Sequence, residues 1–115
     1  MTSQETGHRA EQAALDYLVG HGFTLVQRNF SCKMGEIDLI LKDSKTLIFV
    51  EVRLRHNPYY GSGAESVTFK KRRKIINTAQ FFLLKFPLQG NLDCRFDVIS
   101  MDGEINWIKN AFTLD

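Results

Sequence analysis

Cysteine is scarce in this chain, with only Cys32 and Cys94 among its 115 residues. Neither belongs to a CxxC motif or to a Cys/His pattern with metal-ligand spacing, which argues against a zinc site of the usual kinds. Free cysteines in proteins are commonly buried and inert. We therefore expect two buried, reduced thiols in an intracellular protein.

Long apolar runs are also absent. No stretch approaches the ~20 apolar residues that a membrane-spanning helix requires. The N-terminal stretch MTSQETGHRAEQ has no apolar signal core. These features predict a soluble, cytoplasmic protein without a membrane partner.

A strong charge imbalance is missing as well. The net charge of +2 is too small to identify a nucleic-acid partner, so the distribution of basic residues matters more than their total. The apolar content of 43% and the charged content of 24% are typical of a globular protein. At 115 residues the chain has room for one domain with a hydrophobic core, residues 1–115, and not for two.

The hydrophobic periodicity predicts two helices and five strands. Helical spacing of apolar residues marks two segments, and alternating or continuous apolar runs between turn residues mark the others. The predicted helices cover about residues 6–20 and 68–86, and the predicted strands are FTLVQRNF, 35–42, 46–54, CRFDVISM and EINWIKN. The fold class is therefore α/β, a single domain with a mixed β-sheet flanked by helices in the order α-β-β-β-α-β-β. The second helix would connect two parallel neighbouring strands.

The hairpin formed by residues 35–42 and 46–54 carries several charges on one face. We expect Ile37, Leu39 and Leu41 to point to one side of the sheet, and Glu36, Asp38 and Ile40 to the other. With the turn centred near Ser44, residues whose numbers sum to about 88 or 89 face each other.

This register places Asp38 opposite or nearly opposite Glu51, and Glu36 near Arg53. Two such close carboxylates repel each other unless a cation lies between them, and oxygen ligands of this kind suit Mg²⁺ or Mn²⁺. The alternative is that Glu36 and Arg53 form a surface ion pair while Asp38 and Glu51 reach solvent at a sheet edge.

Four sequence segments resemble a known family. GEIDLI and FVEVRLR, with GHRAEQAALDYLVGHGF before them and CRFDVI after them, are similar to the YraN family of uncharacterised bacterial proteins. That family resembles the archaeal Holliday-junction resolvases and, more broadly, the restriction-endonuclease-like PD-(D/E)xK nucleases. The resemblance extends from about Gly7 to Trp107. It implies a restriction-endonuclease-like fold, a Mg²⁺ or Mn²⁺ cofactor and cleavage of DNA, including branched DNA, by a homodimer.

The resemblance also assigns roles to individual residues. Asp38 matches the motif aspartate, Glu51 the acidic residue of the E-x-K element, and Arg53 stands where its lysine would be. Glu11, on the first helix, matches a glutamate that many such nucleases use at the metal site, and Glu36 would be an outer acid. The arginine is a departure, because a guanidinium is bulkier than an ammonium group and cannot be deprotonated. A catalytically silent protein that binds nucleic acid or acts as an adaptor therefore remains an alternative, as does a structural partner in a larger complex.

The basic residues cluster in the sequence KKRRK, near the start of the second predicted helix. The cluster is either a solvated helix face or a clamp for DNA phosphates beside the acidic pair. The stretch RHNPYYGSG is either an ordinary loop or one that contacts DNA, and there His56 is either polar surface or a general base. Asp97 either serves the family motif or pairs with Arg95 or Arg55. The candidate nucleic-acid contacts are Lys70, Lys71, Arg72, Arg73, Lys74, Arg55 and Tyr60.

Overall fold

In the residues that the structure describes, the apolar patterns give rise to five strands in one mixed sheet and two helices. The computed structural model describes residues 3–54, 67–87 and 93–113. The elements are α1 (Ser3–Gly20), β1 (Thr24–Cys32), β2 (Gly35–Asp43), β3 (Thr46–Leu54), α2 (Phe69–Lys85), β4 (Asp93–Met101) and β5 (Ile105–Phe112). The predicted order α-β-β-β-α-β-β is therefore confirmed.

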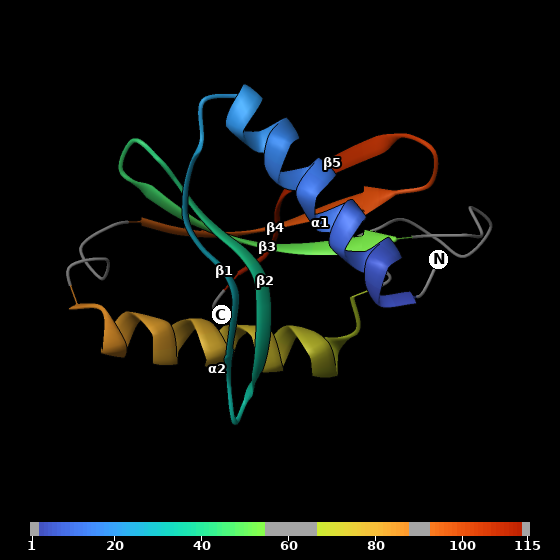
Figure 1. The fold of residues 1–115 in the computed structure, drawn as a ribbon. Coiled ribbons are helices and arrows are strands. Elements are labelled where there is room, and N and C mark those ends of the chain that lie inside the picture. The colour runs from blue at the N-terminus through green and yellow to red at the C-terminus, as the bar shows by residue number, and fades with distance from the viewer. Residues whose placement is uncertain (1–2, 55–66, 88–92, 114–115) are drawn as a thin grey trace.

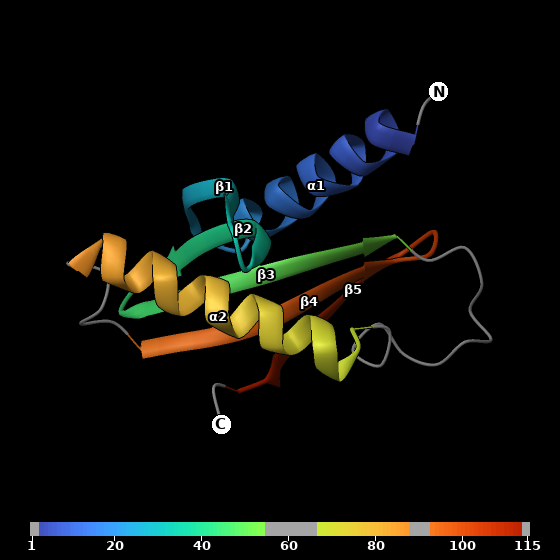
Figure 2. The ribbon, with the colours of Figure 1, turned by 90° about the horizontal axis from the view of Figure 1, so that it is seen from below.

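The strands lie in the sheet in the order in which they occur in the sequence, β1-β2-β3-β4-β5. Only β3 and β4 are parallel, and α2 connects them, as predicted. The two helices cover opposite faces of the sheet, which makes a three-layered α/β domain (Figures 1 and 2). Neither helix in the described ranges has the length and apolar character needed to cross a membrane.

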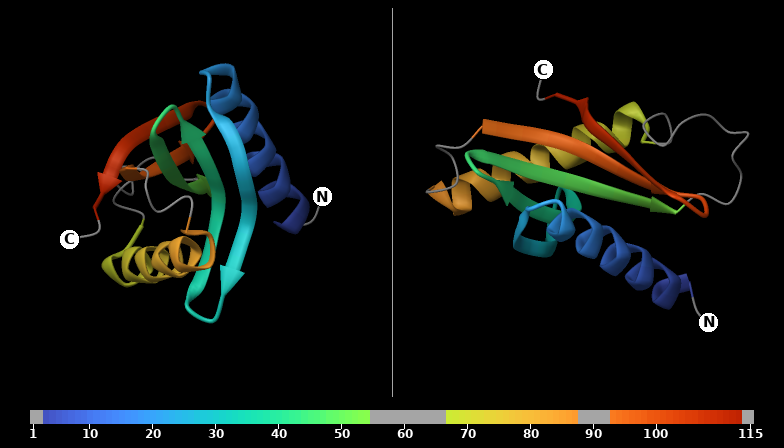
Figure 3. Two further views of the ribbon diagram at one scale, coloured as in Figure 1. Left: turned by 90° about the vertical axis from the view of Figure 1, so that its left-hand side faces the viewer. Right: turned by 90° about the horizontal axis from the view of Figure 1, so that it is seen from above.

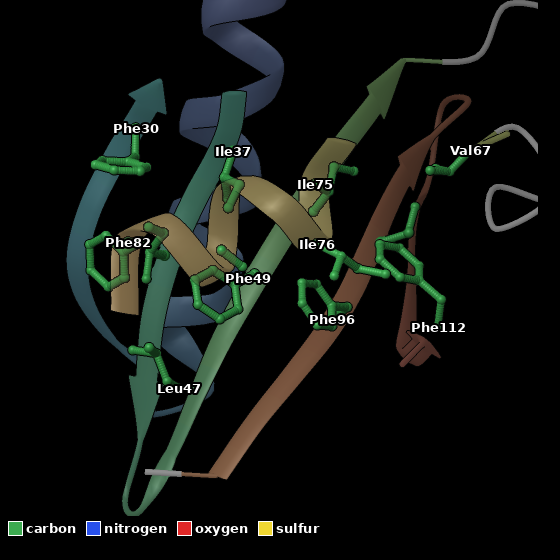
Figure 4. Packing of buried hydrophobic residues seen from close by; sticks show 13 residues of the cluster. Phe30, Ile37, Leu47, Phe49, Val67, Ile75, Ile76, Phe82, Phe96 and Phe112 are labelled. Atoms are coloured by element: carbon green, nitrogen blue, oxygen red, sulfur yellow. The ribbon is translucent and has the colours of Figure 1, made fainter. Parts of the chain in front are cut away.

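Each face of the sheet has its own hydrophobic core. Under α1, Ala14 and Leu18 pack on residues of the central strands such as Ile48 and Val50. The opposite core lies between α2 and the other face of the sheet, and Figure 3 shows the two helices on their separate sides. Figure 4 shows this second core, which includes Phe30, Ile37, Leu47, Phe49, Val67, Ile75, Ile76, Phe82, Phe96 and Phe112.

Ile37 departs from the predicted alternation. It packs in the core under α2 with Ile40, whereas Leu39 and Leu41 pack under α1. The pairing of β2 with β3 ends at Leu39, while its pairing with β1 continues to Gly35. The free end of the β1–β2 hairpin extends toward α2 (Figure 1), and Ile37 packs there in the core under that helix.

A close approach at Gly35 fixes the hairpin against α2. Gly35 has φ of +153°, and a Cβ atom there would lie 3.1 Å from Thr78 Oγ1 and 3.4 Å from Lys74 Cβ. Glycine is the residue that tolerates both the backbone conformation and the contact. The first turns of α2 are therefore held beside the start of β2, where the acidic residues lie.

Smaller differences from the prediction concern the ends of elements and the burial of single residues. Ser31 and Cys32 continue β1 beyond the predicted strand FTLVQRNF, so only Lys33 and Met34 form the turn before β2. Cys32 and Cys94 are both free but only half-buried, so the expectation of full burial is wrong. Phe86, the last residue of the second predicted helix, lies beyond the last turn of α2 and is 38% exposed.

Candidate functional site

The acidic pair lies where β2 and β3 separate. Paired residues in this hairpin have numbers that sum to 89, from Asp43 with Thr46 to Leu39 with Val50. Asp38 and Glu51 are the next two positions, so the predicted register is confirmed. Asp38 no longer takes part in the ladder; instead its Oδ2 accepts a hydrogen bond of 2.8 Å from the backbone N–H of Val52. The separation of the strands thus directs the Asp38 carboxyl group toward β3.

Glu51 is buried, with 6% of its side chain exposed. Its charge is balanced by two cations. Lys71 Nζ, from α2, lies 2.7 Å from Glu51 Oε1, and Arg53 Nη1 lies 3.9 Å from the same oxygen. A buried carboxylate without such partners would be costly. The alternative in which Glu36 pairs with Arg53 is not what the described residues show.

The environment of Asp38 favours its neutral form. Burial raises the pKa of Asp38 to about 8, and the negative charges of Glu51 and Glu11 act in the same direction. A hydrogen bond between the Asp38 and Glu51 side chains also raises this pKa, because only a protonated carboxyl group can donate it. The hydrogen bond from Val52 opposes these effects but does not outweigh them. If both carboxyl groups were ionised, they would therefore repel each other.

Asp38→Asn should stabilise the metal-free protein at high pH. The pKa of Asp38 is raised on folding. The folded wild-type protein therefore becomes less stable as pH rises from about 4, where Asp38 ionises in the unfolded chain, to about 8, where it ionises in the folded protein. The amide keeps an acceptor for Val52 and has no charge. The difference in unfolding free energy between variant and wild type should grow from near zero at pH 4 to several kcal/mol, and level off above pH 8.

Urea unfolding followed by circular dichroism in EDTA measures this difference. Asp43→Asn is the matched control, because Asp43 is an exposed carboxylate on the same strand. Its difference from wild type should stay within about 0.5 kcal/mol across the range. A constant difference for Asp38→Asn at every pH would contradict the raised pKa.

A pocket of about 230 Å³ opens beside the acidic pair. β2 and β3 contribute its acidic wall and α2 its basic wall. The pocket is lined by Gly35, Glu36, Asp38, Glu51, Lys71, Lys74 and Ile75. Glu36 thus shares a face with Asp38, as predicted. Opposite charges on facing walls of a partly open pocket suit a ligand that carries both a cation and an anionic group.

Glu11 lies apart from this pocket and is connected to it by Asn29. The Asn29 side-chain amide donates to Glu11 Oε1 at 2.9 Å and to Glu36 Oε1 at 3.2 Å. Asn29 has a positive φ of 52°, and the register places it opposite Asp38 on β1. Asn29 was not among the predicted site residues, and its signal in the sequence is a polar residue within a predicted strand.

Arg53 occupies the predicted position two residues after Glu51. Its side chain is 34% exposed, and it does not line the pocket of the acidic pair. Its nearest described acidic partner is Glu51, through the longer of the two ion pairs. Arg53 therefore lies beside the site, farther from Glu51 than Lys71 does.

The KKRRK cluster is divided between two sides of α2. Lys71 and Lys74 face the acidic pocket. Arg72 and Arg73 line a separate pocket of about 450 Å³ next to Phe69 and Phe112. Lys70 is exposed. Arg55 and Tyr60, together with His56 and Tyr59, lie outside the described residues.

Asp97 lies at the centre of a hydrogen-bonding cluster outside the acidic pocket. Its buried carboxylate accepts two hydrogen bonds from Arg95, one from Trp107 Nε1 and one from the backbone N–H of Asn110, each 2.8–2.9 Å long. The predicted pairing with Arg95 is confirmed. Asp97 thus connects β4 to β5 away from the acidic pocket.

In the part of the chain that the structure describes, Asp38 and Glu51 are the two acids of β2 and β3 that share the pocket and interact with each other. Among the described residues, no group of three or more His, Cys, Asp or Glu side chains is arranged to hold one. Asp38 and Glu51 nevertheless fit Mg²⁺ or Mn²⁺, because Mg²⁺ commonly takes one or two carboxylates together with waters and substrate phosphate. A divalent cation would also relieve the repulsion that raises the pKa of Asp38.

The sequence profile of the uncharacterised protein family UPF0102 matches residues 10–101. The chain belongs to this family. A UPF0102 protein of Saccharophagus degradans is 50% identical over 112 residues, which cover 96% of this chain and 95% of that protein. A UPF0102 protein of Legionella pneumophila is 47% identical over 113 residues, which cover 96% of both chains. The family-level resemblance to YraN proteins is thus confirmed, while the wider resemblance of this UPF0102 protein to nucleases remains a prediction.

Proposed function

We propose that this UPF0102 protein is a metal-dependent nuclease with a restriction-endonuclease-like fold that hydrolyses phosphodiester bonds in DNA. The observation that carries the proposal is the convergence of Asp38 and buried Glu51 in a pocket whose opposite wall carries Lys71 and Lys74. An acidic pair attracts a divalent cation, and adjacent ammonium groups attract phosphate. A phosphodiester with its metal ion satisfies both walls at once.

The reaction adds one water across a P–O ester bond. The water oxygen bonds to phosphorus, the ester P–O bond breaks, and one proton of the water passes through solvent to the departing oxygen. Bound Mg²⁺ or Mn²⁺ supplies Lewis-acid chemistry, polarising the phosphate and lowering the pKa of a water molecule. Asp38 and Glu51 hold the ion, and the cationic side chains stabilise the negative charge that develops on the phosphate.

The supporting roles follow from the positions of the other candidates. Glu11 and Glu36, joined through Asn29, add negative charge next to Asp38 and orient the β1–β2 end of the site. Lys70, Arg72 and Arg73 extend the basic surface along the start of α2 and would contact the DNA backbone. Branched DNA as substrate, a homodimer and a cytoplasmic location follow from the family resemblance alone and are part of the proposal.

A cleavage assay with metal substitution tests the proposed activity. Labelled linear duplex, single-stranded and four-way-junction DNA are each incubated with the wild-type protein in Mg²⁺, Mn²⁺, Ca²⁺ or EDTA. We expect cleavage in Mg²⁺ or Mn²⁺ and none in EDTA, because the acidic pair cannot act without a cation. The Asp38→Asn protein, purified in the same way, controls for a contaminating nuclease. Equal cleavage by both proteins, or none by wild type in any metal, would contradict the proposal.

The second candidate is a catalytically silent DNA-binding protein. It is favoured by Arg53, which replaces the lysine of the E-x-K element, and by the ion pair that already joins Lys71 to Glu51. Such a protein would bind DNA equally well in EDTA and in Mg²⁺ and would cleave it in neither. Binding measured by fluorescence anisotropy under both conditions separates this candidate from the nuclease.

A further inference from the structure

Lys71 reaches the acidic pair from α2, whereas Arg53, the cation that the sequence pattern indicates, is on β3. It is in the first turn of α2, where its backbone N–H donates to the Oγ1 of the N-cap residue Thr68. Its Nζ lies 2.7 Å from Glu51 Oε1, and its side chain lines the pocket together with Asp38 and Glu51. The helix cap fixes the backbone at Lys71, and the approach of Gly35 to Lys74 and Thr78 holds α2 beside the start of β2.

Arg53 is less well placed for the same task. Its Nη1 lies 3.9 Å from Glu51, and its side chain does not line the pocket. Lysine has a compact ammonium group on a flexible four-carbon stem, whereas the guanidinium of arginine is broad and planar. The compact ammonium group of Lys71 therefore fits between the acidic pair and a phosphate better than the broad guanidinium of Arg53 would.

Lys71 also keeps contact with solvent, with 39% of its side chain exposed. Glu51 has a second cation in Arg53, so its charge remains partly balanced when Lys71 turns toward a ligand. Lys71 can therefore leave Glu51 for an incoming anion at a lower cost than the sole partner of a buried carboxylate could.

We propose that Lys71 is the catalytic cation of this site, contacting the phosphate next to the acidic pair in the role that the sequence pattern assigns to Arg53. This inference rests on the proposed function for the nature of the ligand, a nucleic-acid phosphodiester. The short contact to Glu51 marks the resting position of the side chain. In the complex its ammonium group donates to a phosphate oxygen and stabilises the charge that develops there.

The test compares Lys71→Gln, Lys71→Arg, Arg53→Gln and Lys85→Gln. Lys85 is at the far end of α2 and is exposed, so its variant removes the same charge from the same helix away from the pocket. Two quantities are measured for each protein. One is the single-turnover cleavage rate at saturating protein, and the other is the affinity for duplex DNA in EDTA as a function of salt.

We expect Lys71→Gln to lower the single-turnover rate by about 10²-fold, as loss of one charge-stabilising donor typically does. It should also reduce the slope of log affinity against log salt by about one, because one phosphate contact is lost. Lys71→Arg should restore the slope but not the full rate. Arg53→Gln should change the rate by less than about tenfold and leave the slope unchanged, and Lys85→Gln should match wild type.

The outcomes separate this inference from the proposed function. Absence of cleavage by wild type contradicts the proposed nuclease, and the salt slopes then still decide whether Lys71 contacts phosphate. A slope unchanged in Lys71→Gln overturns the inference whether or not the protein cleaves. So does an active wild type in which Arg53→Gln loses more rate than Lys71→Gln.

Discussion

Asp38→Ala and Glu51→Ala are each expected to reduce metal-dependent DNA cleavage by about 10³-fold or more. The reason is geometric. The two carboxyl groups occupy the first positions beyond the end of the β2–β3 ladder and share one pocket, so either one alone leaves half of the cation site. Single-turnover cleavage of junction and duplex DNA in Mg²⁺ measures the loss.

Stability must be separated from activity in this experiment. Glu51→Ala leaves Lys71 and Arg53 without their buried partner, so a lower melting temperature could lower activity on its own. Glu51→Gln keeps the volume of the side chain and provides the second variant. Asp43→Asn, on the strand of Asp38 but at its exposed end, should retain wild-type activity. Cleavage within tenfold of wild type by folded Glu51→Gln would contradict the assignment of the acidic pair.

The acidic pair could be predicted from the sequence because it depends on local rules. Alternation along β2, a turn near Ser44 and the continuous apolar run of β3 set the register, and the register alone places Asp38 opposite Glu51. The same reasoning failed at Ile37, one residue away. There the ladder has ended, and packing against α2 decides the direction of the side chain.

The position of Lys71 on the inner side of its helix could be predicted from the sequence, but its ion pair with Glu51 could not. In the sequence, KKRRK reads as one charged run, but a helix turns each residue by about 100°. Lys71 lies four residues before Ile75 and eight before Ala79, on the inward-facing stripe of α2. Its helical position was therefore predictable. Its partner was not, because the placement of α2 over the end of β3 depends on contacts such as Gly35 with Thr78, which bring together distant parts of the chain.

Asp97 shows the limit of motif reasoning. The sequence offered two roles for it, a family motif and an ion pair, and both rested on residue type alone. The geometry that distinguishes them is an irregularity in the pairing of β4 with β5 between Phe96 and Val98. At this irregularity the Asp97 carboxylate accepts the N–H of Asn110, which has a positive φ of 52°. The Asp97 side chain thus replaces a backbone acceptor at this point, and no local sequence pattern predicts this replacement.

Asp97→Ala is expected to destabilise the protein by about 3–5 kcal/mol, the range typical of removing one partner from a buried ion pair. Asp97 is fully buried, and its loss would leave unpaired the Arg95 guanidinium, the Trp107 indole N–H and the Asn110 N–H. Because small domains are stable by only about 5–15 kcal/mol, a large share of the total would be lost. The free energy of unfolding from urea titrations, followed by circular dichroism, measures this.

Two further variants show whether the cause is the hydrogen-bonding cluster. Asp97→Asn keeps the shape and one acceptor, so it should fall between wild type and Asp97→Ala. Asp93→Ala, at the exposed start of the same strand, should stay within about 0.5 kcal/mol of wild type. If Asp97→Ala kept full stability but lost DNA binding or cleavage, Asp97 would belong to the functional site and the structural assignment would be wrong. Loss of stability in proportion to the hydrogen bonds removed would place Asp97 in the framework that joins β4 to β5.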